Sequence, residues 1–189
     1  MNLTLIVILA VVVVLALYTT LIYNNLVRLK HTVAKAWSNI DVALKQRHDE
    51  LPKLVNVCKR YMRHEQETLT RVVAARGEVL AAQNAGDVRD LGRAETALRA
   101  GLDRLFALAE SYPDLKADRG FQQLSQRISQ LEDTIADRRE LYNESVNLNN
   151  VRIEQFPDVF VARMFGFLAA DLLEFEAARK DVDIAKLFA

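Results

Sequence analysis

The most constraining feature of the sequence is an uncharged apolar run at its N-terminus. Leu3 to Ile22 is dominated by Leu, Ile and Val, and the first charged side chain is Arg28. A helix of this length spans about 30 Å, the thickness of the hydrocarbon core of a bilayer. It also satisfies its own backbone hydrogen bonds, as lipid requires. Tyr18 and Tyr23 are of a type that favours the membrane interface. The run therefore predicts a transmembrane helix.

A cleaved signal peptide is the main alternative for this run. Signal peptides usually have a basic N-terminus, a shorter apolar core and small residues before the cleavage site. Met1-Asn2 carries no basic side chain, and Ala16-Leu17-Tyr18 is a poor cleavage site. We therefore expect a retained anchor.

The charges that flank the run predict its orientation. Arg28, Lys30 and Lys35 follow it, and no basic side chain precedes it. The positive-inside rule then places the short N-terminus outside and the following domain in the cytoplasm. No Gly or Pro occurs before Pro52. The anchor could therefore continue unbroken into the first helix of the domain, and a flexible turn at Asn24-Asn25 would refute this.

The rest of the chain has a helical pattern. Apolar residues recur at spacings of three, four or seven, and no alternation is long enough to build a sheet. The first stripe predicts a helix from Asn24 to about Ala82, kinked near Gln46–Pro52 because proline lacks the N–H that would bond the carbonyl of His48. The residues of this stripe are Trp37, Ile40, Leu44, Leu51, Leu54, Cys58, Tyr61, Val72, Ala75 and Val79.

Turn signals divide the remainder. Gln83 to Asp87 is a turn, and Asp87 is expected to cap a second helix that ends before Pro113. On that helix Gly101 would allow close approach of another backbone. A third helix is expected from about Leu115 to Gln155. After Phe156-Pro157, Asp158 could cap a short helix, Val159 to Leu173.

These elements predict an all-α fold. An N-terminal transmembrane helix is followed by an antiparallel helical bundle of three long helices and a shorter fourth. The expected boundaries are 1–23 for the anchor, 24–176 for the bundle and 177–189 for a C-terminal tail.

Composition and motifs argue against several function classes. The chain has 25 basic and 25 acidic residues, so it lacks the basic excess of a nucleic-acid-binding protein. It has neither a Gly-rich phosphate loop nor a Gly-x-Ser-x-Gly elbow. His64-Glu65 lacks the second histidine of a zinc protease motif. We expect no catalytic residue, metal or cofactor. Cys58, the only cysteine, lies on the apolar stripe and is expected in the core.

Polar residues at apolar-stripe positions, or sharing one helix face, form a possible polar cluster. Its members are Arg47, Glu65, Arg138, Asn143 and Asn150. One interpretation is a buried network that fixes the register of the bundle, because buried polar groups need partners. The other is a site for a ligand or partner.

Several segments in order resemble the LemA family. They are residues 23–29 (YNNLVRL), 36–42 (AWSNIDV), 45–55 (KQRHDELPKLV) and 112–117 (YPDLKA), and the resemblance extends to about residue 176. The chain departs from the family pattern at His48, often Tyr, and at Asn149, usually aromatic. The resemblance implies a bacterial inner-membrane protein with a helical-bundle domain and no established catalytic residues.

Three functions follow as hypotheses. The first is a membrane-anchored scaffold or assembly protein without catalytic activity, homo-oligomeric, in contact with the lipid bilayer and with a possible membrane-protein partner. The second is a membrane-bound ligand-sensing or signalling module that uses the polar cluster. The third is an enzyme that uses His64 and Glu65.

Overall fold

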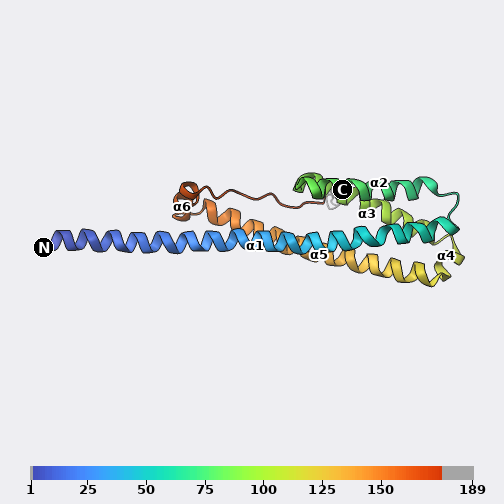
Figure 1. Ribbon diagram of the computed structural model, residues 1–189, viewed down its shortest axis with the longest axis horizontal. Coiled ribbons are helices and arrows are strands. Elements are labelled where there is room, and N and C mark those ends of the chain that lie inside the picture. Colours follow the sequence, from blue (N-terminus) through green and yellow to red (C-terminus); the bar gives the residue numbers. More distant parts are fainter. Residues whose placement is uncertain (1, 176–189) are drawn as a thin grey trace, which may run out of the picture. The chain divides into compact units, whose positions relative to one another are not determined.

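The computed structural model describes residues 2–175, and every regular element in that part of the chain is an α-helix (Figure 1). This confirms the predicted all-α fold with a long apolar helix at the N-terminus. The tail predicted at 177–189 lies outside the described residues. The helices are α1 (Leu3–Tyr61), α2 (Gln66–Ala85), α3 (Val88–Ala109), α4 (Pro113–Ala117), α5 (Arg119–Glu154) and α6 (Asp158–Phe165).

Residue contacts divide the chain into two compact units. Of the described residues, unit 1 contains 2–39 and 140–172, and unit 2 contains 40–139 and 173–175. α1 and α5 each supply one part to each unit. Unit 1 also contains α6, and unit 2 contains α2, α3 and α4.

In unit 1 the apolar run begins α1 and has almost no protein around it. Residues 3–21 are exposed apart from half-buried Thr19. Figure 1 shows this part of α1 projecting past α6 without another segment of unit 1 beside it. A core helix of a soluble protein would instead be buried. The N-terminal part of α1 is therefore a candidate membrane span by exposure as well as by length and composition.

Packing in unit 1 begins where the apolar run ends. Ile22 and Leu26 are buried, and they form one cluster with Ile153 of α5 and with Val161 and Ala162 of α6. These positions on α1 are four apart, so they lie on one face of the helix. This contact places α6 directly beside the end of the apolar run.

The helix does not break between the run and this cluster. α1 continues through Asn24 and Asn25, which confirms the prediction of an unbroken connection. It also continues through Pro52 in unit 2. The candidate membrane span is therefore the beginning of the first helix of the domain and not a separate tether.

The first predicted helix was too long, because α1 ends at Tyr61 and α2 begins at Gln66. The intervening turn contains the polar sequence Arg63-His64-Glu65, and the chain folds back after it. α2 then lies antiparallel to α1 in unit 2, where Arg76 contacts His48 and Gln83 contacts Asp41. Folding back buries the apolar stripes of both helices, which one continuous helix would leave exposed.

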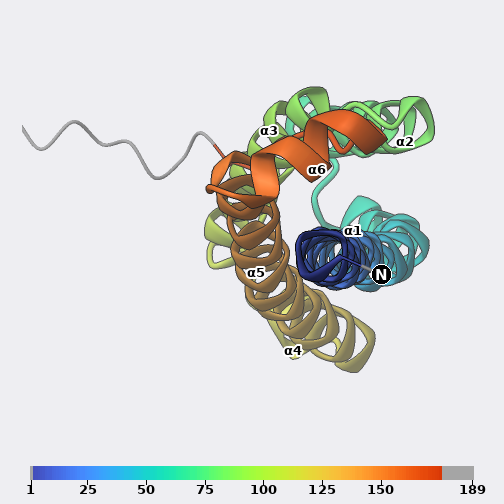
Figure 2. The same cartoon turned by 90° about the vertical axis from the view of Figure 1, so that its left-hand side faces the viewer.

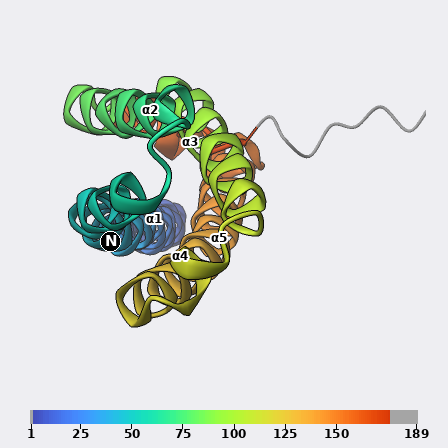
Figure 3. The ribbon, with the colours of Figure 1, turned by 90° about the vertical axis from the view of Figure 1, so that its right-hand side faces the viewer.

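α2 and α3 form a helical hairpin, and Figures 2 and 3 both show them side by side. Gly86 ends α2 with a φ of 70°, a left-handed conformation that glycine adopts at no steric cost. Gly101 faces Val72 on α2, but a Cβ added there would lie 3.4 Å from Cγ2 of Val72, an ordinary van der Waals distance. The contact therefore leaves room for a methyl group and does not need the glycine that was predicted to allow close approach.

The predicted helix caps have different outcomes. Asp87 caps α3 as expected, because its side chain accepts hydrogen bonds from the backbone N–H groups of Arg89 and Asp90 at 2.9 and 3.0 Å. Pro157, not Asp158, is the N-cap residue of α6 and makes no side-chain cap, and Asp158 is the first residue of the helix. Its buried carboxylate pairs with Arg152 of α5.

The third predicted helix is divided in two by Asp118. α4 ends before this residue and α5 begins after it. The Asp118 side chain accepts a hydrogen bond from the backbone N–H of Phe121 at 3.0 Å and from the hydroxyl of Tyr61 at 2.9 Å. These hydrogen bonds lower the pKa of the Asp118 carboxyl below its ordinary value. Asp118 therefore caps α5 and links it to the end of α1.

α6 is shorter than the predicted helix, which extended to Leu173. It ends at Phe165, and Gly166 follows with a φ of 70°. The N–H of Gly166 bonds the carbonyl of Ala162, which closes the last turn. Residues 167–175 are not helical.

Part of this non-helical segment covers α3 in unit 2. At Gly92 an added Cβ would lie 2.1 Å from the backbone oxygen of Glu174, so no side chain fits there. Leu173 and Phe175 on either side are buried. Gly92 therefore provides the space in which the segment contacts α3.

We expect opposite effects of adding a methyl group at the two glycines of α3. Gly92→Ala should lower the free energy of unfolding and release residues 173–175, because the methyl group collides with a backbone oxygen. Gly101→Ala should be neutral or stabilising by up to about 1 kcal/mol, because alanine favours helix and its contact with Val72 is an ordinary one. Denaturant unfolding of the full-length protein in mild detergent, followed by circular dichroism, measures both. Equal stability of the two variants would contradict the close contact at Gly92.

Candidate functional site

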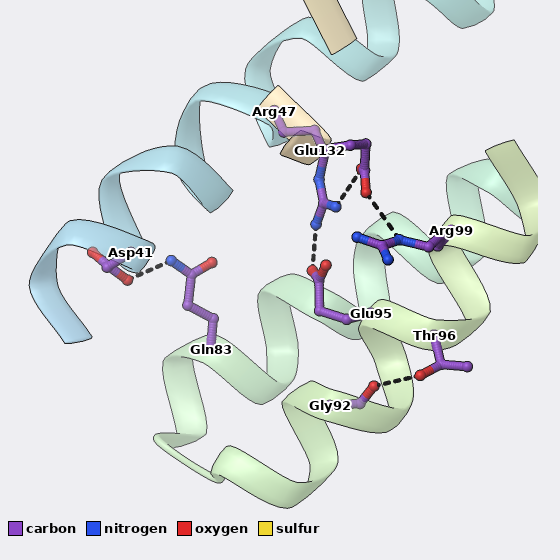
Figure 4. A network of polar contacts seen from close by, with 8 residues as sticks. All are labelled: Asp41, Arg47, Gln83, Gly92, Glu95, Thr96, Arg99 and Glu132. Carbon is purple, nitrogen blue, oxygen red and sulfur yellow. Dashed lines mark hydrogen bonds and ion pairs between the residues drawn. The ribbon is translucent and has the colours of Figure 1, made fainter. Parts of the chain in front are cut away.

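Among the described residues of unit 2, the most buried charge is that of Arg47, on the apolar stripe of α1. Its side chain is 1% exposed and its guanidinium meets carboxylates from two other helices. Nη1 donates to Oε1 of Glu132 on α5 at 2.6 Å, and Nη2 donates to Oε1 of Glu95 on α3. Figure 4 shows these side chains pointing toward one another. Arg47 thus ties α1, α3 and α5 together within this unit.

The network extends to a second arginine. Nε of Arg99 donates to the other oxygen of Glu132 at 3.3 Å, so this carboxylate bridges two guanidinium groups (Figure 4). The Arg99 guanidinium also lies 5.4 Å from the ring centre of Phe175, and that of Arg139 lies 4.3 Å from the same ring. These are cation–π distances. Phe175 therefore connects the non-helical segment to the network.

Burial and charge have opposing effects on these groups. Burial lowers the pKa of Arg47, but the charges and hydrogen bonds of Glu95 and Glu132 outweigh it, and the pKa is raised overall. Burial raises the pKa of the Glu95 carboxyl, and Arg47 offsets this only in part. Arg47 therefore stays charged, and its carboxylate partners satisfy both of its Nη atoms. Its Nε is buried without a hydrogen-bond partner.

His48, next in the chain, makes a separate contact with α2. Its Nε2 lies 2.6 Å from Nη2 of Arg76, whose Nε donates to the backbone oxygen of His48 at 3.0 Å. A guanidinium can only donate, so Nε2 must accept and the imidazole is neutral. Burial, and then the charge of Arg76, lower the pKa of His48.

The five predicted cluster residues are divided between the two units. Arg47 pairs with Glu95 and Glu132, as described, whereas Glu65 accepts a hydrogen bond from the hydroxyl of Tyr112 at 3.3 Å. The other three are half-buried on α5, with Arg138 in unit 2 and both Asn143 and Asn150 in unit 1.

In unit 1, Asn150 bonds the backbone of the non-helical segment. Its Nδ2 donates to the carbonyl of Ala170, and its Oδ1 accepts from the N–H of Ala170, both at 2.9 Å. The hydroxyl of Tyr142 donates to the carbonyl of Asp171 at 2.9 Å. α5 therefore supplies partners for backbone groups that a helix would have satisfied internally.

Three members of the network, Glu95, Arg99 and Glu132, were missed in the sequence. Glu95 lies four residues after Leu91 and three before Leu98, so the apolar spacing of α3 already placed it on the buried face. Glu132 follows the buried Leu131 and had no comparable signal. Helical spacing assigns a residue to a face but does not say which helix opposes that face.

Other residues considered for chemistry have plain structural surroundings. Cys58 is buried, as predicted, and burial raises the pKa of its thiol to about 11, so it stays protonated at neutral pH. His64 is exposed in the turn between α1 and α2, next to Glu65. Among residues 2–175, no group of three or more His, Cys, Asp or Glu side chains is arranged to hold a metal ion.

Comparison with known proteins agrees with the resemblance seen in the sequence. The LemA family pattern matches residues 36–185. Protein LemA of Metamycoplasma hominis is 29% identical, over 87% of this chain and 74% of its own length. Magnetosome protein MamQ 2 of Paramagnetospirillum magneticum is 24% identical, over 88% of this chain and 71% of its own length. Magnetosome protein MamQ of Magnetospirillum gryphiswaldense is 25% identical, over 84% and 67% respectively.

Removal of the buried guanidinium should destabilise the protein strongly. We expect Arg47→Ala to lower the free energy of unfolding by about 3–5 kcal/mol, because it leaves the Glu95 carboxylate buried without its partner. The double variant Arg47→Met/Glu95→Leu should lose less than the single one, since it leaves no unpaired charge at that contact. Denaturant unfolding in mild detergent measures both.

Arg93→Ala is the matched control, because Arg93 pairs with Asp90 on the exposed surface of α3. Its effect should stay within about 0.5 kcal/mol, as for most surface ion pairs. An Arg47→Ala variant as stable as Arg93→Ala would disprove the structural importance of the network.

The neutral state of His48 predicts a pH dependence. Its folded pKa lies below its unfolded value, so the unfolded chain binds the proton more readily as the pH falls. The contribution of His48 is therefore complete above about pH 6.5 and decreases as the pH falls below it. Thermal unfolding of the wild type and of His48→Gln between pH 5 and 7.5 should show a weaker pH dependence in the variant. His64→Gln, at an exposed position, should match the wild type; a His48→Gln profile that also matches it would refute this role.

Proposed function

We propose that this chain, which belongs to the LemA family, is a membrane-anchored helical scaffold or assembly protein without catalytic activity. The proposal rests on the apolar N-terminal part of α1, whose side chains are exposed. This part is continuous with the first helix of the domain. An apolar helix with exposed sides needs a lipid environment or other helices around it. The names of the relatives reported above specify no reaction.

The charge pattern supports a location and an orientation for this proposal. Arg28, Lys30 and Lys35 follow the apolar run, and no basic side chain precedes it. We place the run in the bacterial inner membrane as a single span. The short N-terminus is outside and the helical units are in the cytoplasm, where the positive-inside rule predicts the basic flank.

An exposed apolar face on α5 supports self-association. Leu141, Leu148 and Val151 of unit 1 are exposed although they are large and apolar. Their spacings of seven and three are those of successive core positions in a coiled coil. Such a face is costly in water unless a partner covers it. We assign a second copy of the chain as that partner.

The proposed anchor restricts how copies can pair. Every copy enters the membrane in the same direction, so the α5 helices of neighbouring copies point the same way. A parallel arrangement about an axis normal to the membrane brings Leu148 of one copy next to Leu148 of another. The homo-oligomer is thus a parallel assembly along α5.

Native mass spectrometry of the full-length protein in lipid nanodiscs tests this proposal. The wild type should be an oligomer. Leu148→Glu should reduce it to a monomer, because like charges then face each other across the α5 contact. A wild-type monomer without crosslinked partners would refute the scaffold hypothesis.

Asn147→Glu provides the control, because residue 147 is exposed and lies at the same level of α5 but outside the apolar face. It adds the same charge and should leave the oligomer intact. If Leu148→Glu and Asn147→Glu both retained the wild-type oligomer, self-association through this face would be disproved. If both dissociated it, added charge and not the apolar face would be responsible.

A further inference from the structure

Unit 1 has a second exposed apolar surface, formed by α6 and the turns that flank it. Between residues 156 and 168, five large apolar side chains are exposed, three of them by more than seven-tenths: Phe156 at 76%, Met164 at 73% and Leu168 at 82%, with Phe160 and Phe165 beside them. The rings of Phe156 and Phe160 contact each other edge to face, with centres 5.9 Å apart. Single exposed apolar residues are common, whereas a cluster of this size usually marks a binding surface.

The position of this surface indicates what covers it. The opposite face of α6, Val161 and Ala162, packs on Ile22 and Leu26. Tyr23 contacts the ring of Phe165, with centres 4.8 Å apart. α1 is exposed up to Leu21 and becomes buried at Ile22. α6 therefore lies at the level where the apolar run ends, as Figure 1 shows.

The charges of the segment fit a lipid surface. Its acidic residue, Asp158, is buried and paired with Arg152, while Arg163 is exposed. The exposed face is thus aromatic and aliphatic with a basic side chain and no carboxylate. A short helix with this composition suits the boundary between acyl chains and headgroups.

We propose that residues 156–168 are embedded in the membrane interface, with α6 lying beside the anchor as a second membrane contact. This inference rests on the proposed anchor. Phe156, Phe160 and Met164 enter the acyl-chain boundary, and the face formed by Val161 and Ala162 stays on α1. The continuity between this surface and the apolar run favours lipid as the occupant.

A hollow next to α6 provides a polar complement. It has a volume of about 470 Å³ and is lined by Lys30 and His31 of α1 and by Phe165 and Leu168. Lys30 lies about 12 Å beyond Ile22 along the helix, so its long side chain can extend toward lipid phosphates. Along α1 from the apolar run toward the domain, the apolar surface therefore comes first, at the level of the acyl chains. The basic hollow comes next, at the level of the headgroups.

Site-directed spin labelling of the full-length protein in nanodiscs tests the inference. The nanodiscs contain phosphatidylcholine and phosphatidylglycerol. A nitroxide is attached at Met164→Cys, with Val12→Cys as the lipid control and Ser38→Cys as the water control. Ser38 is exposed in unit 1 and lies about 24 Å beyond Ile22 along α1. Native Cys58 is buried, and the unmodified chain measures any label attached there.

The readout is the ratio of collisions with oxygen, which concentrates in lipid, to collisions with a water-soluble nickel chelate. We expect this ratio to be severalfold higher at Met164 than at Ser38 and to approach that at Val12. A ratio at Met164 equal to that at Ser38 would overturn the inference. Spin–spin broadening at Met164 that disappears on dilution with unlabelled chain would also overturn it, because α6 would then face a second copy.

The Val12 label separates this inference from the proposed function. If Val12 is in lipid and Met164 is in water, the anchor stands and the interfacial position of α6 fails. If Val12 itself contacts water, the anchor fails and the position of α6 fails with it.

Discussion

Water cannot favourably solvate the apolar start of α1, and unit 1 is organised around this constraint. Each square ångström of apolar surface removed from water contributes about 25 cal/mol, and this part of the helix has almost no protein to cover it. Protein packing takes over at Ile22, where α6 and α5 close on α1. The first buried residue of α1 is Ile22, and the next is Leu26, one turn further along the same face. α6 therefore lies where a lipid environment and a protein core would meet.

In unit 2 a charged side chain occupies the place of an apolar one. Arg47 is buried on the stripe of α1, where leucine or isoleucine would satisfy the helical pattern. A buried ion pair adds little net stability compared with apolar residues of similar size. We interpret the network as a means of fixing the register of the helices. The Arg47 guanidinium is paired at both Nη atoms only when the helices bring Glu95 and Glu132 beside it.

The sequence was sufficient for the fold class and for much of its detail. Helical spacing predicted long helices, Asp87 predicted a cap, and the lack of Gly and Pro predicted continuity through Asn24. The break after Tyr61 was missed because it contains neither Gly nor Pro. The only local signal was a polar stretch, which also suits an exposed helix turn. Tertiary packing decided between the two, since the chain had to fold back to bury both stripes.

The candidate site was predictable in part, for a similar reason. Arg47 was identified because it interrupts an apolar stripe, whereas its partners lie far away in the sequence and on other helices. Asn150 was also identified, but its partner is the backbone of Ala170, in a segment predicted to be helical. Gly166 was the available signal that this helix ends early. A periodic pattern reveals faces, and only the three-dimensional structure reveals which faces meet.

The continuity of α1 has a consequence for how its length can vary. One residue inserted into an α-helix rotates everything beyond it by about 100° and advances it by about 1.5 Å. Upstream of Ile22 such a change only lengthens or shortens a bare helix, which tilt can accommodate. Between Ile22 and Leu26 it would turn one of these residues away from α6. Insertions and deletions in relatives should therefore be tolerated on the N-terminal side of Ile22 and excluded just after it.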